Sequence, residues 1–231
     1  MMLHFDAPPI VTVPITGSEK AFPVRRIFCV GRNYAAHAAE MGGEVDREAP
    51  WYFTKSTHAI AQSGQTLPYA LESQNYHHEM ELVVAIGQGA FRADSKQAMD
   101  AVFGYACGLD MTRRDLQQVG KDNRRPWDLG KDIENGAVVA AITPKDVVGC
   151  LNGRSIGLSV NGDVRQEATL DDMVWSVAEI ISHLSRYYHL SSGDLIMTGT
   201  PAGVGPVHPE DVVRGWIDGL ADVEMKVGAY S

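Results

Sequence analysis

The sequence predicts an α+β fold that is made mostly of strands. Short apolar runs bounded by turn residues recur at 26–30, 79–86, 104–110 and 194–197, and such runs are typical of strands. Glycines punctuate residues 203–219 and indicate closely spaced turns. Helical patterns are few, and no glycine-rich loop of the dinucleotide- or phosphate-binding kind occurs. The pattern therefore favours a mostly β domain with a few flanking helices.

Composition narrows the class of protein. The chain has 231 residues, enough for one domain with a sizeable core, and a formal net charge of −9. That charge disfavours nucleic acid as a partner, because phosphates are neutralised by basic surfaces. No apolar run approaches the roughly 20 residues that cross a bilayer, and the N-terminus resembles no secretory signal. We expect a cytoplasmic protein with no nucleic-acid or membrane partner.

The cysteines support the same compartment. Cys29, Cys107 and Cys150 are far apart in the sequence and lie in apolar contexts. They form no metal-binding spacing, so they predict buried free thiols in a reducing environment.

The N-terminal half alternates short strands with one helix. Residues 1–24 contain four prolines and predict an arm or edge strand, followed by one domain over 25–231. Residues 26–30 predict a strand. The alanine-rich stretch 33–41 favours a helix that ends at two glycines. Residues 51–53 predict a further strand.

The C-terminal half follows the same plan. Helices are expected over 95–103 and 111–118, on either side of the strand 104–110. A strand over 154–160 meets Asn161-Gly162, a strong hairpin signal. The clearest helix is predicted over 172–188, with an apolar stripe formed by Met173, Val177, Ile180, Ile181 and Leu184.

Glu79 and Glu81 are the most informative residues. They begin an apolar run that predicts a strand, and alternation would direct both carboxylates to the same face. Two like charges on a half-buried face require a compensating charge, and carboxylate oxygens suit Mg²⁺, Mn²⁺ or Ca²⁺. The alternative is a solvated face with Met80 and Leu82 in the core. His77 lies two residues before Glu79, so its side chain is expected on the same face as the two acids. It would be either a further metal ligand or a structural histidine.

A third acid strengthens the metal interpretation. Asp110 ends the apolar run that starts at Val102, so it could end a neighbouring strand. Arg114 and Gln117 follow, three residues apart on one helix face, where a guanidinium could bind a carboxylate in bidentate fashion. An ordinary exposed helix would carry the same pair.

Several other polar residues are candidates with structural alternatives. His37 and Glu40 are three apart in the expected helix and suit general acid–base chemistry, although such a pair also occurs on ordinary surface helices. Lys55 could stabilise an oxyanion, or be a strand-end lysine. Lys131 is ambiguous alone, and Thr200 lies in a turn that could bind an anion.

Together these pieces resemble, in content and order, the fumarylacetoacetate hydrolase family. The resemblance covers about residue 25 to the C-terminus and is closest to the short acylpyruvase and fumarylpyruvate hydrolase branch. It rests on Gly31-Arg32-Asn33-Tyr34 with His37 and Glu40, Phe53-Thr54-Lys55, His77-His78-Glu79-Met80-Glu81-Leu82, Gly108-Leu109-Asp110 through Gln117, Arg125-Pro126-Trp127-Asp128-Leu129-Gly130-Lys131, and Thr198-Gly199-Thr200-Pro201-Ala202-Gly203.

The resemblance implies a mixed β-sandwich roll, a homodimer and a bound Mg²⁺ or Mn²⁺, with Ca²⁺ as a substitute. The implied metal ligands are Glu79, Glu81 and Asp110. The implied catalytic residues are His37, Glu40, Lys55 and Gln117, and the implied substrate-binding residues are Arg32, Tyr34, Arg114, Lys131 and Thr200. The sequence departs from the family pattern in two places. Ser56 stands where the family commonly has a proline, and the segment 132–137 after Lys131 differs from the common one.

The leading hypothesis is hydrolysis of a C–C bond in a small anionic 2,4-dioxo acid. Fumarylpyruvate is the expected substrate, with fumarate and pyruvate as products, in the breakdown of aromatic compounds. The alternatives are oxaloacetate decarboxylation, isomerisation of an oxo-enoic diacid, and a non-catalytic metal-stabilised module that binds a dicarboxylate.

Overall fold

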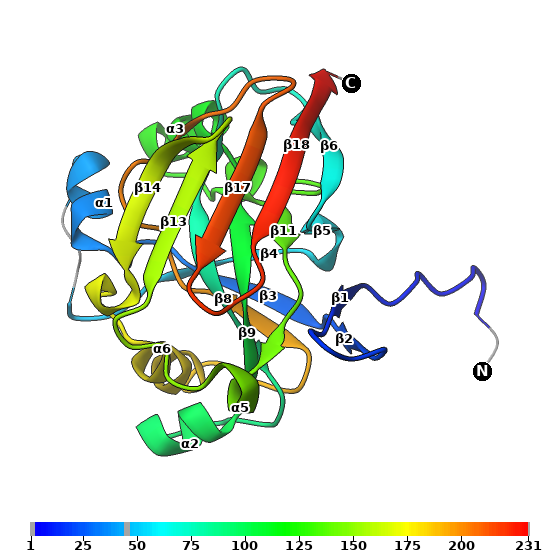
Figure 1. Ribbon diagram of the computed structural model, residues 1–231, viewed down its shortest axis with the longest axis vertical. Helices are drawn as coiled ribbons and strands as arrows, with labels where there is room; N and C mark the ends of the chain where they lie inside the picture. The colour runs from blue at the N-terminus through cyan, green and yellow to red at the C-terminus, as the bar shows by residue number, and fades with distance from the viewer. Residues whose placement is uncertain (1–2, 44–46, 231) are drawn as a thin grey trace.

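Two β-sheets lie face to face in the computed structural model, which describes residues 3–43 and 47–230 (Figure 1). The larger sheet is mixed, and its strands in spatial order are β4 (Tyr52–Lys55), β3 (Arg26–Val30), β15 (Asp194–Met197), β8 (Met80–Ile86), β9 (Val102–Asp110), β11 (Ala137–Val139) and β5 (Ile60–Gln62). Strand β12 (Thr143–Pro144) pairs with β9 beside this path. The predicted class, α+β and mostly β, is confirmed.

The second sheet covers one face of the first. Its strands in order are β14 (Asp163–Thr169), β13 (Ser155–Val160), β17 (Val212–Ile217), β18 (Val223–Tyr230) and β6 (Gln65–Tyr69). Apolar side chains of both sheets, such as Leu82 and Leu158, fill the space between them. The predicted hairpin is confirmed, since Asn161 and Gly162 join β13 to β14 with φ of 54° and 90°, as a two-residue hairpin turn requires.

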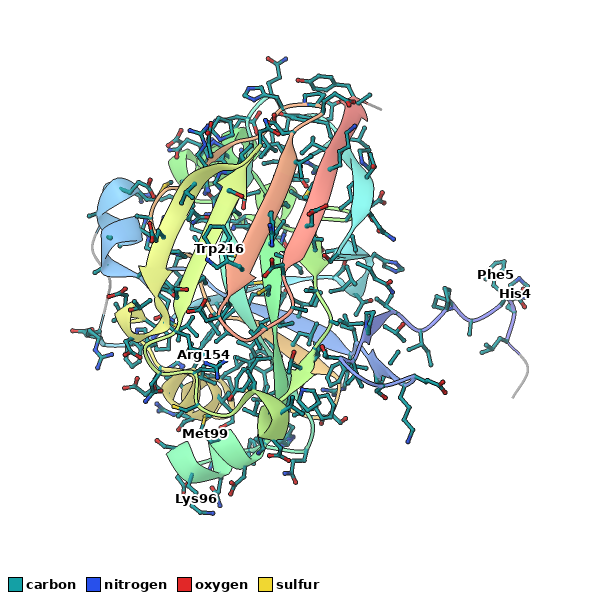
Figure 2. All side chains as sticks on the ribbon, in the orientation of Figure 1. His4, Phe5, Lys96, Met99, Arg154 and Trp216 are labelled. Atoms are coloured by element: carbon teal, nitrogen blue, oxygen red, sulfur yellow. The ribbon has the colours of Figure 1, made fainter. Side chains whose placement is uncertain are left out.

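Smaller elements surround the two sheets. The short strands are β10 (Thr112–Arg113), β7 (Tyr76–His78) and β16 (Gly205–Pro206) in one sheet and β1 (Thr12–Pro14) and β2 (Ala21–Pro23) in another. The helices are α1 (Ala35–Glu40), α2 (Ser95–Asp100), α3 (Arg114–Asp122), α4 (Asp128–Lys131), α5 (Lys145–Val148) and α6 (Val177–Leu184), with 3₁₀ turns at Thr57–Ala59 and Leu170–Asp172. Helices α2, α5 and α6 gather at one end of the molecule (Figure 1). An N-terminal arm leads away from the body, with His4 and Phe5 far out along it (Figure 2).

Strand β8 is buried on both faces, which explains its unbroken apolar sequence. Leu82 faces the second sheet, whereas Val83 belongs to a core on the opposite face. Val13 and Phe22, from the β1–β2 pair, close that second core. Because side chains alternate along a strand, Glu81 is directed to the same side as Val83.

The predicted helix over 172–188 is shorter in the structure. Helix α6 begins at Val177 because Ser176 and Glu179 form a capping box that fixes its first turn. Met173, placed by the pattern in the helical stripe, instead forms an isolated bridge with Tyr34. Periodicity alone did not separate this apolar residue from the helix that follows it.

Two further boundaries differ from the expected ones, both next to the short strand β7. The helix expected over 111–118 begins only at Arg114, because Thr112 pairs with His77 of β7 as a strand residue. The strand expected over 79–86 begins one residue late, at Met80, and Glu79 lies between β7 and β8. Its carbonyl accepts a hydrogen bond from the backbone N–H of Asp110 at 2.9 Å.

The cysteine prediction is partly wrong. Cys29 and Cys107 are buried free thiols, but Cys150 is exposed, because it lies in the turn after α5 rather than in a strand. Within residues 3–43 and 47–230, no helix combines the length and the apolar character that a membrane crossing needs.

Candidate active site

Three buried carboxylates converge where β8 begins and β9 ends. Glu79, Glu81 and Asp110 are each less than 5% exposed, and each offers an oxygen within 4.8 Å of the others. The antiparallel pairing of β8 with β9 places Met80 opposite Leu109, so the start of one strand lies beside the end of the next. Strand parity and adjacency therefore bring together the three acids that the sequence singled out.

Two cations compensate part of this negative charge. Lys131 Nζ donates to Glu79 Oε2 at 2.7 Å, to Asp110 Oδ2 at 2.8 Å and to Thr112 Oγ1 at 2.7 Å. Arg114 Nη2 donates to Glu79 Oε1. Burial raises the pKa of Glu79, but Lys131 and Arg114 outweigh burial and hold that pKa below its usual range. Glu79 is therefore a carboxylate at neutral pH.

Glu81 is compensated far less. Its Oε2 accepts one hydrogen bond, from the backbone N–H of Gly199 at 2.7 Å, and it forms no ion pair within the described part of the chain. Burial, Asp110 and Glu79 together raise the pKa of Glu81 well above its usual value. The charged form of a carboxylate buried between two others is stable only with a further positive charge beside it.

Lys55 lies against the same cluster, but its protons are directed elsewhere. Its Nζ is 2.8 Å from Asp110 Oδ1, yet it donates to the carbonyls of Met111, Lys131 and Gly136. An ammonium group has three protons, so those carbonyls use all of them. Asp110 Oδ1 is consequently buried without a hydrogen bond from any described residue, although the charge of Lys55 is close.

The donor set fits a hard divalent cation. It consists of carboxylate oxygens, which Mg²⁺ and Mn²⁺ prefer to nitrogen or sulfur ligands. Asp110 Oδ1 and the second oxygen of Glu81 have no hydrogen-bond donor within residues 3–43 and 47–230. Glu79, Glu81 and Asp110 are the residues that would hold such an ion.

Helix α1 supplies a second polar pair, as its sequence spacing predicts. His37 Nδ1 lies 3.0 Å from Glu40 Oε2, and the backbone N–H of Gly203 donates to Glu40 Oε1 at 3.0 Å. The His37 side chain is 6% exposed and that of Glu40 is 33% exposed. His37 is also close enough to Glu79 to help lower its pKa, so the pair lies beside the acidic cluster.

Arg114 and Gln117 are joined on one face of α3, as predicted. Arg114 Nη1 donates to Gln117 Oε1 at 2.7 Å, which directs the amide nitrogen of Gln117 away from the guanidinium. That nitrogen donates no hydrogen bond to any described residue. His77 accepts from Arg114 Nε at 3.5 Å and contacts Asn75 Oδ1 at 2.8 Å. Burial and Arg114 lower the pKa of His77 to about 4, so it is a neutral partner of Arg114.

Thr200 is fixed by a residue that sequence reasoning missed. Gln166, on β14, is 1% exposed and donates to Thr200 Oγ1 and to the Pro201 carbonyl, both at 2.8 Å. Its Oε1 accepts from the backbone N–H of Met80 at 3.0 Å. Gln166 therefore joins the 198–201 turn to the start of β8, and no local pattern indicates such a role.

Two more of the sequence candidates lie at the entrance of α1. The Tyr34 hydroxyl is buried without a hydrogen bond to the described residues, and burial and Glu81 raise its pKa. The Arg32 guanidinium lies over Gly43, just past the helix, where a Cβ would approach its Nη1 to 2.4 Å. Gly43 thus leaves space for this cation.

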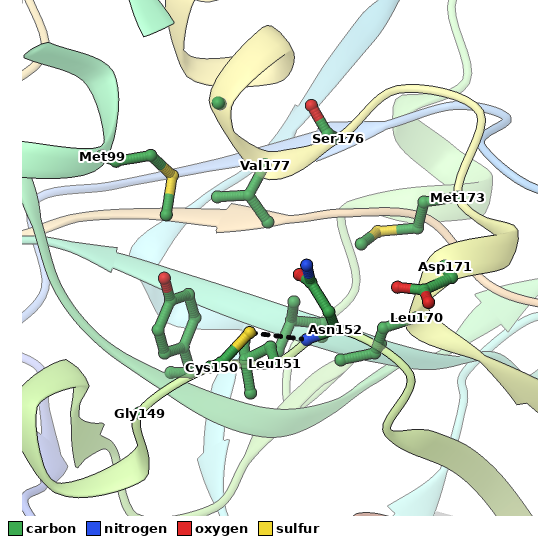
Figure 3. A pocket seen from close by; sticks show the side chains of 13 residues that line it. Met99, Gly149, Cys150, Leu151, Asn152, Leu170, Asp171, Met173, Ser176 and Val177 are labelled. Carbon is green, nitrogen blue, oxygen red and sulfur yellow. Dashed lines mark hydrogen bonds between the residues drawn. The ribbon is translucent and has the colours of Figure 1, made fainter. Parts of the chain in front are cut away.

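Cavities occur on both sides of the larger sheet. One of about 580 Å³ lies on the Leu82 side, opposite to the carboxylates (Figure 3). Its contacts include the Asn152 backbone N–H, which donates to Cys150 Sγ at 3.4 Å, but no lysine, arginine or histidine lines it. A second cavity of about 390 Å³ is lined by Lys131, Arg125 and the aromatic rings of Phe53 and Trp127. The second one is the better match for an anionic substrate.

Comparisons with known proteins identify the family of this chain. The model of the fumarylacetoacetate (FAA) hydrolase C-terminal family matches residues 26–228. A fumarylpyruvate hydrolase of Ralstonia sp. is 50% identical over 190 residues, 81% of this chain and 98% of that protein. This chain belongs to the fumarylacetoacetate hydrolase family.

Further relatives in the family differ in activity. A mitochondrial oxaloacetate decarboxylase of Dictyostelium discoideum is 41% identical over 203 residues, 87% of this chain and 92% of that protein. The crystal structure of fumarylpyruvate hydrolase from Pseudomonas aeruginosa in complex with Mn²⁺ and pyruvate superposes with a TM-score of 0.95 at 45% identity, covering 98% of this chain and all of that one.

The two departures from the family pattern contact each other in the structure. The backbone N–H of Ser56 donates to Asp132 Oδ1 at 2.8 Å. A proline at position 56 would have no N–H to donate, so this hydrogen bond depends on the residue present at position 56. The same segment supplies the Gly136 carbonyl that accepts from Lys55.

Proposed function

We propose that this protein hydrolyses the C3–C4 bond of 3-acylpyruvates, with fumarylpyruvate as its substrate and fumarate and pyruvate as products. The observation that carries the proposal is the convergence of three buried carboxylates beside the His37–Glu40 pair. The 50% identity to a fumarylpyruvate hydrolase supports the choice of substrate. This activity would give the protein a place in the breakdown of aromatic compounds.

His37 and Glu40 would activate the attacking water. Their 3.0 Å contact allows the imidazole and the carboxylate to take up the water proton together. The Gly203 N–H fixes the Glu40 carboxylate. The hydroxide formed in this way attacks the C4 carbonyl carbon.

Gln117 is the best-placed donor for the oxyanion that forms at C4. Its amide nitrogen has no protein partner among the described residues, and one preorganised donor of this kind is typically worth about 3 kcal/mol. Lys55 adds positive charge nearby and would donate directly only by exchanging one of its carbonyl partners. Arg114 retains N–H groups beyond those used by Glu79, Gln117 and His77, and with Thr200 it would bind the carboxylate of the pyruvate half. Lys131 adds positive charge there and would donate directly only by exchanging one of its three present acceptors.

The proposed cofactor is Mg²⁺ or Mn²⁺, held by Glu79, Glu81 and Asp110. When bound, it would supply Lewis-acid stabilisation of the negative charge on the departing enolate. The presence of Mn²⁺ in the crystal structure of the P. aeruginosa relative supports this assignment.

A homodimer is part of the same proposal. The N-terminal arm exposes Leu3, Phe5 and Ile10 at 66%, 81% and 75% and projects away from the body (Figure 2). Exposed apolar side chains of this kind commonly mark an interaction site, and a second copy of the chain is the proposed occupant. Light scattering of the full chain and of a chain without residues 1–10 should show loss of the dimer on truncation.

Turnover of several substrates tests the activity. Fumarylpyruvate, acetylpyruvate and oxaloacetate would each be followed by loss of enol absorbance, with Mn²⁺ and with a chelator. Metal-dependent hydrolysis of the acylpyruvates is expected, and Glu81→Gln should abolish it. The exposed Glu210→Gln is the matched control. Full activity of the wild type in chelator would remove the metal from the mechanism.

Oxaloacetate decarboxylation is the second candidate, favoured by the 41% identity to the Dictyostelium enzyme. Turnover of oxaloacetate without turnover of any acylpyruvate would select it. Binding without turnover of any of the three would instead indicate a non-catalytic module.

A further inference from the structure

Two rows of side chains lead outward from the carboxylate cluster. On β4, residues 51, 53 and 55 share one face, and Lys55 is the member at the cluster, 2.8 Å from Asp110. On α3, Arg114, Gln117 and Lys121 share one face at spacings of three and four, and Arg114 is the member that contacts Glu79. Both rows therefore start at the carboxylates and continue away from them.

Trp127 joins the outer ends of these rows. Its ring lies 4.9 Å from that of Trp51 and 6.4 Å from that of Phe53, between centroids. On the helix side, Lys121 Nζ lies 5.1 Å from the Trp127 ring, which is within cation–π distance. The Lys121 ammonium is thus held at a defined place beyond Gln117.

Lys121 has no acidic partner in the part of the chain that the structure describes. It forms no ion pair and donates no hydrogen bond to any residue in the described ranges. Burial lowers the pKa of Lys121, and the charges of Arg114 and Arg32 lower it further, against an opposite effect of Glu79. Arg32 also lacks an acidic partner among the described residues.

The cations beside the carboxylate cluster are therefore of two kinds, those paired with an acid and those without an acidic partner among the described residues. Arg114 and Lys131 are matched by Glu79 and Asp110. Among the described residues, Lys121 and Arg32 are left as two cations without an acidic partner. A half-buried pair of this kind is stabilised when an anion lies between or beside the two charges.

We propose that Lys121, assisted by Arg32, binds the carboxylate at the far end of the acyl group, so that the enzyme selects acylpyruvates whose acyl half is itself an acid. The inference rests on the proposed hydrolase function and adds the determinant of substrate class. Trp127 is a positioning residue for Lys121.

The dimensions agree with this assignment. Arg114 and Lys121 are seven residues apart, which is about 10 Å along a helix axis. An extended chain advances about 3.8 Å over three bonds, so the five bonds from C2 to C7 of fumarylpyruvate span about 6 Å. With the oxygen atoms at either end, the substrate can reach from the carboxylate cluster to Lys121.

A pair of substrates tests the proposal. Fumarylpyruvate has the distal carboxylate and acetylpyruvate lacks it, so the ratio of their kcat/KM values measures recognition of that group. Lys121→Met retains the apolar stem against Trp127 and removes the charge. Loss of a charged hydrogen bond should lower the ratio about 10- to 100-fold, mainly through KM for fumarylpyruvate. Lys121→Arg should restore most of the ratio.

The matched control is Lys96→Met, on α2, whose side chain is 86% exposed and lies at the far end of the molecule (Figure 2). A ratio within twofold of wild type in Lys121→Met, or an equal loss with both substrates, would overturn the subsite while hydrolysis itself stands. A wild-type enzyme that cleaves neither acylpyruvate would overturn the proposed function instead.

Discussion

His37 can be tested independently of the metal ligands, because it belongs to α1 and contacts no member of the carboxylate cluster directly. Its role as part of the base predicts that His37→Ala lowers kcat for fumarylpyruvate by a factor of about 10² to 10⁴. Mn²⁺ affinity should stay within a few-fold of wild type. Steady-state kinetics and calorimetric Mn²⁺ titration measure the two quantities separately.

The control for that experiment is His208→Ala. His208 is a largely exposed histidine that pairs with Asp211 at 3.6 Å, far in sequence from the proposed base. An unchanged kcat in His37→Ala would exclude His37 from water activation. Equal losses of kcat and of Mn²⁺ binding would indicate a structural role.

Local spacing predicted those parts of the site that are local. The i, i+3 pairs His37–Glu40 and Arg114–Gln117 are hydrogen-bonded as expected, because three residues bring side chains onto one helix face. Gln166 and the Gly199 N–H could not be predicted. They reach the site from 86 and 118 residues away in sequence, and only the strand order of the folded sheets brings them there.

Element boundaries show the same division between local and distant causes. Strands β3 and β15 match their expected ranges because each apolar run ends at a turn residue. Helix α3 begins three residues late because β10 pairs with β7, a contact made across 35 residues. Capping shortened α6, and the Ser176–Glu179 box that causes it was present in the sequence as a readable signal.

The link between β4 and the segment after α4 gives an element-level prediction. Ser56 has φ −68°, so Ser56→Pro should introduce no backbone strain. It removes only the N–H that donates to Asp132, at a cost of about 1 kcal/mol. In an Asp132→Ala background that cost is absent. Proline should then raise the free energy of unfolding by about 0.4–1 kcal/mol, because it reduces the conformational entropy of the unfolded chain.

A double-mutant cycle by urea denaturation measures this coupling. The two single variants and the double variant should give a coupling free energy of about 1 kcal/mol. Additive effects of the two substitutions would show that the Ser56–Asp132 contact carries no stability.

The start of α3 predicts a pH dependence. Burial raises the pKa of Asp115, but hydrogen bonds from the Gln74 N–H, the Ser73 hydroxyl and the Leu116 N–H outweigh burial and lower it. A lowered folded-state pKa contributes stability above the unfolded pKa of about 3.9, and this stability is lost as pH falls through the folded value.

Asp115→Asn should therefore cost about 1 kcal/mol at pH 7, and the difference from wild type should shrink progressively below about pH 5. Urea denaturation at several pH values measures it. The exposed Asp163→Asn serves as the control. A constant difference down to pH 3 would show that the charge of Asp115 contributes nothing.

At the scale of the whole molecule, the core contains a cluster of acids that destabilises the folded state. The larger sheet is covered on both faces, and at one end of this buried layer stand three carboxylates, of which Glu81 forms no ion pair with a described residue. Like charges in such a place destabilise the folded state. The residues of the proposed metal site therefore lower the stability of the metal-free protein, and bound metal should raise the free energy of unfolding.

Thermal unfolding with and without Mn²⁺ tests this balance. At Mn²⁺ concentrations 100-fold above Kd, binding stabilises the wild type by about 2.7 kcal/mol, or about 5–10 °C for a domain of this size. In chelator, Glu81→Gln should be at least as stable as wild type, because it removes a buried acid whose charged form has no ion pair among the described residues. It should lose most of the Mn²⁺ shift, whereas Glu210→Gln, at a 73% exposed side chain, should keep all of it. If Glu81→Gln were less stable than wild type in chelator and still gained the full Mn²⁺ shift, Glu81 would be a structural residue and the carboxylate cluster would need another purpose.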